Sequence, residues 1–180
     1  EIIHSSYLNK KLLEHMFKEG LPNSSIEEWK YFDTSLFTKI DWKIPDKNIE
    51  EKCVLENKKN QIIFINGFYS EKHSSIKNKD LSICSIKDYM SDNPNSIKDI
   101  YPGPETYFDV KLSKKTDEKS KTLIILNTIL KRNGVVVKIN KNTTVTDEII
   151  INYVGEDHGI STIISPYTYI ICGKNSKCKI

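Results

Sequence analysis

The stretch GLPNSSIEEWKYFDTSLF, Gly20 to Phe37, combines a helix stop, a helix start and a cluster of aromatic residues. Gly20 can adopt the left-handed backbone conformation that ends a helix, and Pro22 prevents that helix from resuming. Two serine and glutamate pairs then have the three-residue spacing of a capping box, which satisfies backbone N–H groups in a first helical turn. A new helix is therefore expected from about residue 25 to residue 37. The pairs are Ser24 with Glu27 and Ser25 with Glu28.

The aromatic cluster of this stretch is too large for so short a segment to bury alone. It is therefore expected to dock on another surface. For Trp29, core packing is the favoured interpretation, and a recognition patch with Lys30 and Tyr31 is the alternative. Upstream, apolar residues recur at helical spacing from Tyr7 to Glu19, with Ser5 or Ser6 as cap, which predicts an amphipathic helix. The cluster comprises Trp29, Tyr31, Phe32, Leu36 and Phe37.

The middle of the chain alternates short apolar runs with turn signals. Residues 62–65 predict a strand, Asn66-Gly67 a tight turn and residues 68–69 the returning strand. Residues 81–86 predict a further strand, and residues 87–115 predict a loop-dominated bridge with at most one helical turn. The apolar cluster within residues 119–132 ends at Asn133-Gly134, and its length favours a helix.

From Val135 onward, short β-branched runs are separated by turn residues. Strands of nearly equal length with short turns are compatible with a sandwich, a barrel or a solenoid, and the pattern alone does not separate these folds. The predicted strands are residues 135–139, 149–154, 160–164, 167–172 and 178–180.

The opening stretch also resembles the amino-terminal signature of SufD, in the SufB/SufD family of iron–sulfur cluster assembly scaffolds. The matching residues are Gly20, Leu21, Pro22, Glu27, Glu28, Trp29, Lys30 and Tyr31. Two later segments resemble the family in the same order. QIIFINGFYS, residues 61–70, is similar to an apolar strand that enters a Gly turn, and LNTILKRNGVVVKINKNTTVTDEIIINYV, residues 126–154, is similar to a helix followed by the first solenoid turns.

The resemblance implies an α+β fold in which a helical amino-terminal region precedes the first coils of a right-handed parallel β-helix. It implies a region at 1–115 that is helical and mixed with a small hairpin, then a connecting helix and the start of the β-helix at 116–180. Family members are longer, and the chain starts at Glu1 and ends within an alternating apolar pattern, so we expect an amino-terminal fragment.

The resemblance further implies a cytoplasmic, non-catalytic scaffold subunit that assembles with a SufB-like paralogue and a SufC-like ATPase. The iron–sulfur cluster would be handled by the full complex. No catalytic, metal or cofactor residue of the family is carried over to this chain. The sequence has no phosphate-binding loop of the Gly-Lys-Ser/Thr type, so ATPase activity is expected in a partner.

Charge and composition exclude several other classes. With 27 Lys+Arg against 24 Asp+Glu and Arg132 as the single arginine, a nucleic-acid partner is not expected. No apolar run approaches the length of a membrane span. A β-helix enzyme that acts on polysaccharide would need a ladder of carboxylates, which the strands lack. A stand-alone protein-binding adaptor remains an alternative.

Two groups of residues could carry chemistry. Glu156, Asp157 and His158 lie together before a Gly, and a solvated turn is favoured over a metal or acid–base site. The four cysteines are widely spaced, without the close pairs that collect metal ligands. Two of them, Cys84 and Cys172, are expected to be small buried residues on strands.

Overall fold

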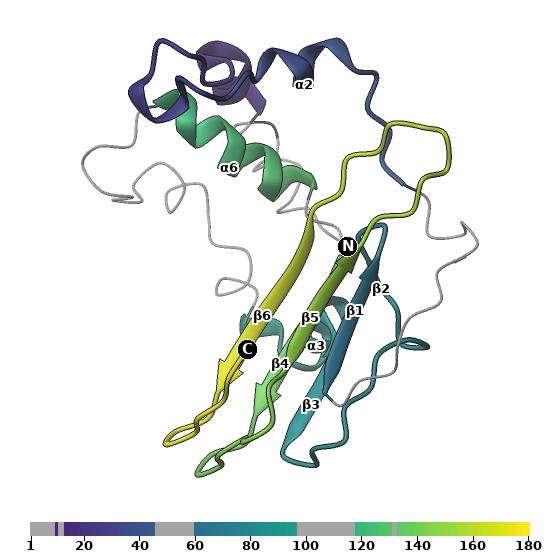
Figure 1. The fold of residues 1–180 in the computed structure, drawn as a ribbon. Helices are drawn as coiled ribbons and strands as arrows, with labels where there is room; N and C mark the ends of the chain where they lie inside the picture. Colours follow the sequence, from purple (N-terminus) through teal and green to yellow (C-terminus); the bar gives the residue numbers. More distant parts are fainter. Residues whose placement is uncertain (1–9, 11–12, 46–59, 97–117, 131–132) are drawn as a thin grey trace. The chain divides into compact units, whose positions relative to one another are not determined.

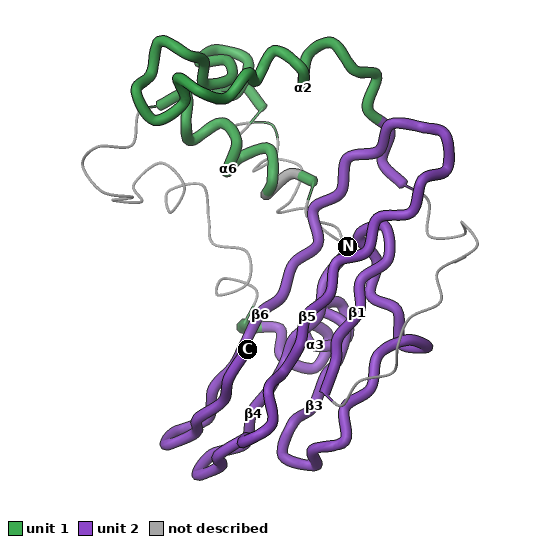
Figure 2. Tube along the Cα trace, in the orientation of Figure 1, with its two compact units in different colours: residues 1–42, 95–130 green, residues 43–94, 131–180 purple. Residues whose placement is uncertain are grey.

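The computed structural model describes residues 10, 13–45, 60–96, 118–130 and 133–180, and the side chains of residues 128 and 129 are not described. The chain divides into two compact units, residues 1–42 with 95–130 and residues 43–94 with 131–180 (Figure 2). Helical turns form the described part of the first unit, and sheets dominate the second (Figure 1). The mixed α+β class is confirmed. The predicted boundary at residue 115 lies outside the described residues.

In the first unit, the predicted helix stop is confirmed. Residues 13–19 are helical, and Gly20 follows with a φ of 72°. The Gly20 N–H donates to the Met16 carbonyl at 2.9 Å, which is the type of bond that closes a helix end. The predicted cap serines lie outside the described residues. The helix predicted at 119–132 is also confirmed as α6, Glu118–Leu130.

The predicted continuous helix from residue 25 to residue 37 is wrong. The segment forms a 3₁₀ turn, Glu27–Trp29, and a short helix α2, Ser35–Lys39. Two side-chain carboxyl or amide oxygens turn the chain: Asn23 Oδ1 accepts from the Ser25 N–H at 3.0 Å, and Asp33 Oδ1 accepts from the Ser35 N–H at 2.9 Å. Such local turns compete with helix continuation. The capping boxes do not form, because Ile26 caps the first turn without a side-chain bond.

In the second unit, one described sheet has the strand order β2-β1-β5. β1, Gln61–Ile65, turns at Asn66 and Gly67 into antiparallel β2, Phe68–Tyr69, as predicted. Both turn residues have positive φ, 48° and 84°, which fits a tight Asn-Gly hairpin. β5, Ile150–Val154, pairs parallel with β1 along its whole length. Every residue of β1 is buried, as expected for a strand paired on both edges.

The other described sheet has the order β3-β4-β6. β3, Leu81–Ser85, is antiparallel to β4, Asn133–Ile139, and β4 is parallel to β6, Pro166–Cys172. A seven-residue helix α3, Ile86–Asp92, follows β3, where the sequence predicted mostly loop. Its start is fixed by Ser85 Oγ, which accepts from the Asp88 N–H at 3.0 Å.

The two long parallel segments of this unit repeat at one constant spacing. The pairs Asn133 with Pro166, Ile139 with Cys172 and Thr144 with Lys177 are each separated by 33 residues. The intervening turns also match, because Asn142 and Asn175 both have positive φ, and Asn175 Nδ2 donates to Asn142 Oδ1 at 3.1 Å. Residues 133–145 and 166–178 therefore follow parallel paths through strand, turn and bridge.

The core of the second unit lies between inward-facing residues of the two sheets. Alternate residues of β1 and of β4 belong to one buried cluster, which Leu81 of β3 and two residues between β4 and β5 complete. This is the period of two that a strand imposes on its faces. The cluster comprises Ile62, Phe64, Leu81, Val135, Val137, Ile139, Val145 and Ile149.

Two of the predicted strands are wrong. Within residues 160–164, only Thr162 forms a bridge, with Lys43, and Ile160 is 53% exposed. Residues 178–180 form no strand either, although the Ile149 N–H donates to the Lys179 carbonyl at 2.9 Å. Both segments have the composition of a strand, but each makes isolated backbone hydrogen bonds and not the continuous series that defines a paired strand.

Replacing Gly173 with alanine should destabilise the second unit. A Cβ at this position would lie 2.5 Å from the backbone nitrogen of Lys141, so the two matched turns would have to separate. We expect a loss of about 1–3 kcal/mol in the free energy of unfolding. Gly155→Ala is the matched control, because a Cβ there meets nothing within 4 Å, and its effect should stay within about 0.5 kcal/mol. Urea denaturation measures both. Equal effects would contradict the close approach of the turns.

Candidate functional site

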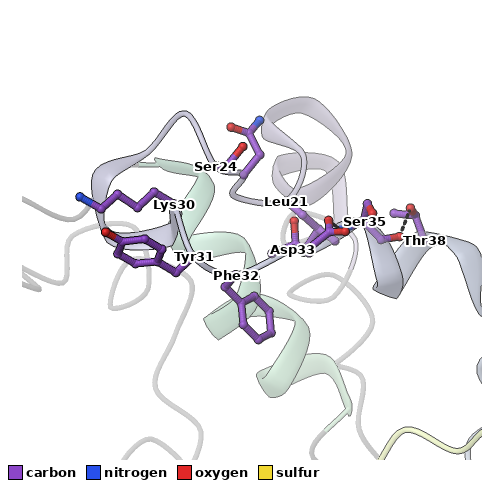
Figure 3. A pocket seen from close by; sticks show the side chains of 10 residues that line it. Leu21, Ser24, Lys30, Tyr31, Phe32, Asp33, Ser35 and Thr38 are labelled. Atoms are coloured by element: carbon purple, nitrogen blue, oxygen red, sulfur yellow. Dashed lines mark hydrogen bonds between the residues drawn. The ribbon is translucent and has the colours of Figure 1, made fainter.

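The stretch from Gly20 to Phe37, called the signature segment from here on, lines most of a surface hollow of about 330 Å³ (Figure 3). The hollow lies between the chain that leaves the first helix and the chain that enters α2. Its lining mixes apolar, hydroxyl and charged side chains, so it can accommodate a polar or an amphipathic group. The lining residues are Leu21, Asn23, Ser24, Lys30, Tyr31, Phe32, Asp33, Thr34, Ser35 and Thr38.

A chain of ring contacts runs along this segment. Trp29 contacts Phe32 edge to face, with ring centroids 5.9 Å apart, and Phe32 contacts Phe37 at 6.5 Å. Phe37 in turn contacts Trp42 at 6.0 Å, and the Trp42 indole N–H donates to the Phe37 carbonyl at 2.9 Å. Aromatic pairs of this kind prefer tilted or edge contacts. The rings therefore order the irregular chain between the 3₁₀ turn and residue 42.

Two buried or half-buried contacts anchor the segment. The Trp29 indole N–H donates to Ser120 Oγ of α6 at 2.7 Å, which joins residues 91 positions apart. The hydroxyl of Thr34, which is 5% exposed, donates to the carbonyl of buried Pro22. Trp29 thus contacts α6 within its own unit and is partly buried.

Other aromatic and apolar side chains of the segment face solvent. Tyr31 is 93% exposed, Phe32 52% and Leu36 56%. The Lys30 ammonium group lies 5.0 Å from the Tyr31 ring centroid and also pairs with Glu27. Among the described residues, nothing covers these three exposed side chains, so the surface on which the cluster is expected to dock is not found there. Exposed aromatic rings beside a hollow are typical of surfaces that bind a partner.

Charge around the hollow is mixed. Hydrogen bonds from Ser35, first from its hydroxyl and then from its backbone N–H, lower the pKa of the Asp33 carboxyl. Asp33 therefore stays ionised near neutral pH. Lys30 provides a cation on the same rim. The arrangement suits recognition by charge and by aromatic contact.

In the second unit, the structure corrects the solvated-turn interpretation of residues 156–158. The side chains of Glu156 and His158 are only 9% and 14% exposed, and Glu156 Oε2 lies 3.5 Å from His158 Nε2. Both residues also contact Asn66 in the β1–β2 turn. Asp157 does not join them, because its carboxylate accepts from the Gly159 N–H at 2.8 Å.

The Asn66 contact could not be found from sequence. The Asn-Gly pair predicted the turn correctly, but residues 66 and 156 are 90 positions apart. The pairing of β1 with β5 brings them together, because Ile65 and Val154 are partners at the ends of these strands.

A family model described as the SufBD protein N-terminal region matches residues 6–151 of this sequence. The chain belongs to the SufBD family. The match includes the signature segment, α6 and the strands β1 to β4, and it ends at residue 151, within β5 and before Glu156. Membership suggests involvement in iron–sulfur cluster assembly and a partner within the SUF complex. No curated protein sequence matches this chain.

In this SufBD family member, Cys172 and Cys178 lie close enough for their side chains to interact, and burial, followed by this contact, raises the pKa of the Cys178 thiol. Cys172 is exposed, so the expectation that it is buried is wrong, whereas Cys84 and Cys178 are partly buried. Burial raises the pKa of the Cys84 thiol. Cys53 lies outside the described residues. No group of three or more His, Cys, Asp or Glu side chains suited to a metal ion occurs among the residues that the structure describes.

Across the described ranges, no helix is both long enough and apolar enough to span a membrane.

Replacing Thr34 with valine should destabilise the signature segment of this SufBD protein. The change removes a donor and leaves the Pro22 carbonyl in a buried setting without that bond. We expect a loss of about 1–3 kcal/mol in the free energy of unfolding. The matched control is Thr38→Val, because the exposed Thr38 hydroxyl donates to the Ser35 carbonyl at 2.8 Å within α2. Its effect should stay within about 0.5 kcal/mol in the same denaturation experiment. Equal losses would refute the anchoring role of Thr34.

Proposed function

We propose that this chain is part of a non-catalytic scaffold subunit of the SUF system for iron–sulfur cluster assembly. The observation that carries the proposal is the SufBD family match over residues 6–151. An assembly role is also supported by the exposed aromatic residues of the signature segment. The cluster would be the cargo of the complete complex, and the chain itself would need no cofactor.

Within the family, we assign the chain to the SufD type. The support is the sequence signature, in which Gly20, Leu21 and Pro22 precede Glu27 and the triplet at residues 29–31. The structure gives this signature physical roles. Gly20 ends a helix, Pro22 presents a buried carbonyl to Thr34, and Trp29 reaches α6.

For the second unit, we propose the first coils of a right-handed parallel β-helix. The support is the constant spacing of 33 residues between paired positions in strand, turn and bridge. Stacking of Asn175 on Asn142 is also typical of solenoid turns, in which each coil repeats the backbone of the coil before it. Parallel pairing of β1 with β5 would supply a second face of the same coil.

The proposed partners are a SufB-like paralogue and a SufC-like ATPase, in the cytoplasm. The sequence lacks a phosphate-binding loop, so the ATPase would be the partner. We place one contact surface at the rim formed by Tyr31, Phe32 and Leu36, because exposed aromatic anchors contribute disproportionately to protein interfaces. A stand-alone adaptor function would use the same surface with a different partner.

Co-purification tests this function. The full-length protein, expressed with its SufB-like and SufC-like counterparts, should elute with both in one complex. Tyr31→Ala should weaken the complex at least about tenfold in dissociation constant if Tyr31 is an interface anchor. Because Tyr31 is 93% exposed, the unfolding midpoint of the variant should not change.

The matched control is Phe17→Ala, which removes another exposed aromatic ring, 80% exposed, from the first helix. It should leave the complex intact. A full-length protein that elutes alone and monodisperse would refute the SUF assignment and favour the adaptor. A complex that forms equally well with Tyr31→Ala would retain the SUF assignment but remove the proposed surface.

A further inference from the structure

The loop between β5 and β6 is fastened to the β1–β2 turn at its start and along its length. The Asn66 N–H donates to the Val154 carbonyl at 2.9 Å, and the Glu156 N–H donates to Asn66 Oδ1 at 2.8 Å. Further along the loop, Ile164 packs closely on Gly67. A Cβ added at residue 67 would lie only 3.0 Å from the Ile164 Cβ. Asn66 is thus the main polar link between the turn and residues 155–158.

The orientation of the Asn66 amide follows from these bonds. Its Oδ1 must face the Glu156 N–H, because a backbone N–H only donates. Its Nδ2 therefore faces His158 Nε2, at 3.1 Å. An amide NH₂ group only donates, so Nε2 must accept, and the neutral ring must carry its proton on Nδ1.

The same nitrogen also faces an acceptor. Glu156 Oε2 lies 3.5 Å from His158 Nε2, and a carboxylate oxygen can pair only with a protonated Nε2. The neutral and the charged forms of His158 therefore have different partners. The neutral ring bonds to Asn66, 92 residues away in sequence, and the charged ring pairs with Glu156, two residues away.

We propose that Asn66, Glu156 and His158 form a proton-operated clasp between the β1–β2 turn and the β5–β6 loop. Protonation of His158 adds N–H at Nε2, which breaks the bond from Asn66 Nδ2 and forms an ion pair with Glu156. Because both side chains of the pair are largely buried, that attraction is less screened than a surface pair. Acid thus moves His158 from a contact that bridges two segments to a contact within its own loop.

Asp157 and Lys43 are charged residues on or beside the β5–β6 loop. Asp157 is turned to the Gly159 N–H, and Lys43, whose backbone pairs with residues 161–163, is exposed. The turn itself contributes the neutral Asn66. Glu156 and His158 lie beyond the residues matched by the family model.

Nitrogen NMR of the full chain, labelled at histidine and asparagine, tests the clasp. At pH 8 the His158 ring should be the Nδ1–H tautomer, with an unprotonated Nε2 that shows scalar coupling to the Asn66 side-chain amide. In an acid titration of the same sample, that coupling should be lost in step with protonation of both ring nitrogens. An Nε2–H tautomer at pH 8, or an Asn66 amide unaffected by protonation of His158, would overturn the proposal.

A pair of matched variants tests the role of Asn66. Asn66→Asp replaces the donor with an acceptor while tolerating the positive φ of 48°, so the neutral ring should switch to the Nε2–H tautomer. Asn175→Asp makes the same change at another turn with a φ of 60° and should leave the His158 tautomer unchanged. A tautomer that does not switch in Asn66→Asp would also overturn the proposal. The wild-type spectrum decides the question if the variant does not fold.

Discussion

The parallel pairing of β4 with β6 at a spacing of 33 residues is the constraint on which the second unit depends. It fixes more than one strand pair, because the turns at residues 140–142 and 173–175 must follow the same path and approach closely enough to exclude a side chain at Gly173. On the other edge of β4 the pairing is antiparallel, with β3. The parallel series in this sheet therefore begins at β4 and proceeds through β6. A proposed β-helix would grow in that one direction.

Parallel pairing in the companion sheet explains where polar groups meet. β1 and β5 end together at Ile65 and Val154, so the Asn-Gly turn after β1 lies against the loop after β5. The aromatic ring of Phe64 is stacked on Tyr153, its register partner, with centroids 5.1 Å apart, and this contact supports the same register. In the first unit, by contrast, order comes from ring contacts and two anchoring hydrogen bonds, while the Tyr31 ring, which is 93% exposed, remains available for a partner. The second unit is thus ordered by repeated strand pairing, and the first unit presents an exposed aromatic side chain.

Much of this architecture could be predicted from sequence where the signal is local. Gly20 as a helix stop, the Asn66-Gly67 hairpin, α6 and the strands β1, β3, β4, β5 and β6 all follow from turn chemistry and apolar pattern. The failures have two causes, local side-chain turns and long-range pairing. The helix expected after residue 25 was replaced by turns in which Asn23 and Asp33 capture nearby N–H groups, and residues 160–164 had strand composition without a partner ladder. The burial of Glu156 and His158 depended on Asn66, which only strand pairing brings near. A contact between residues about 90 positions apart cannot be inferred from the sequence pattern around either residue.

Cross-strand amide contacts in the full protein test the central claim most directly. In a nuclear Overhauser experiment, the account predicts contacts between residues 33 positions apart, Val137 with Ile170 in the strands and Thr144 with Lys177 beyond the turn. These contacts should continue without a change of spacing from strand through turn to bridge. An antiparallel pattern between β4 and β6, or a spacing that changes across the turn, would contradict the repeating geometry and with it the proposed β-helix.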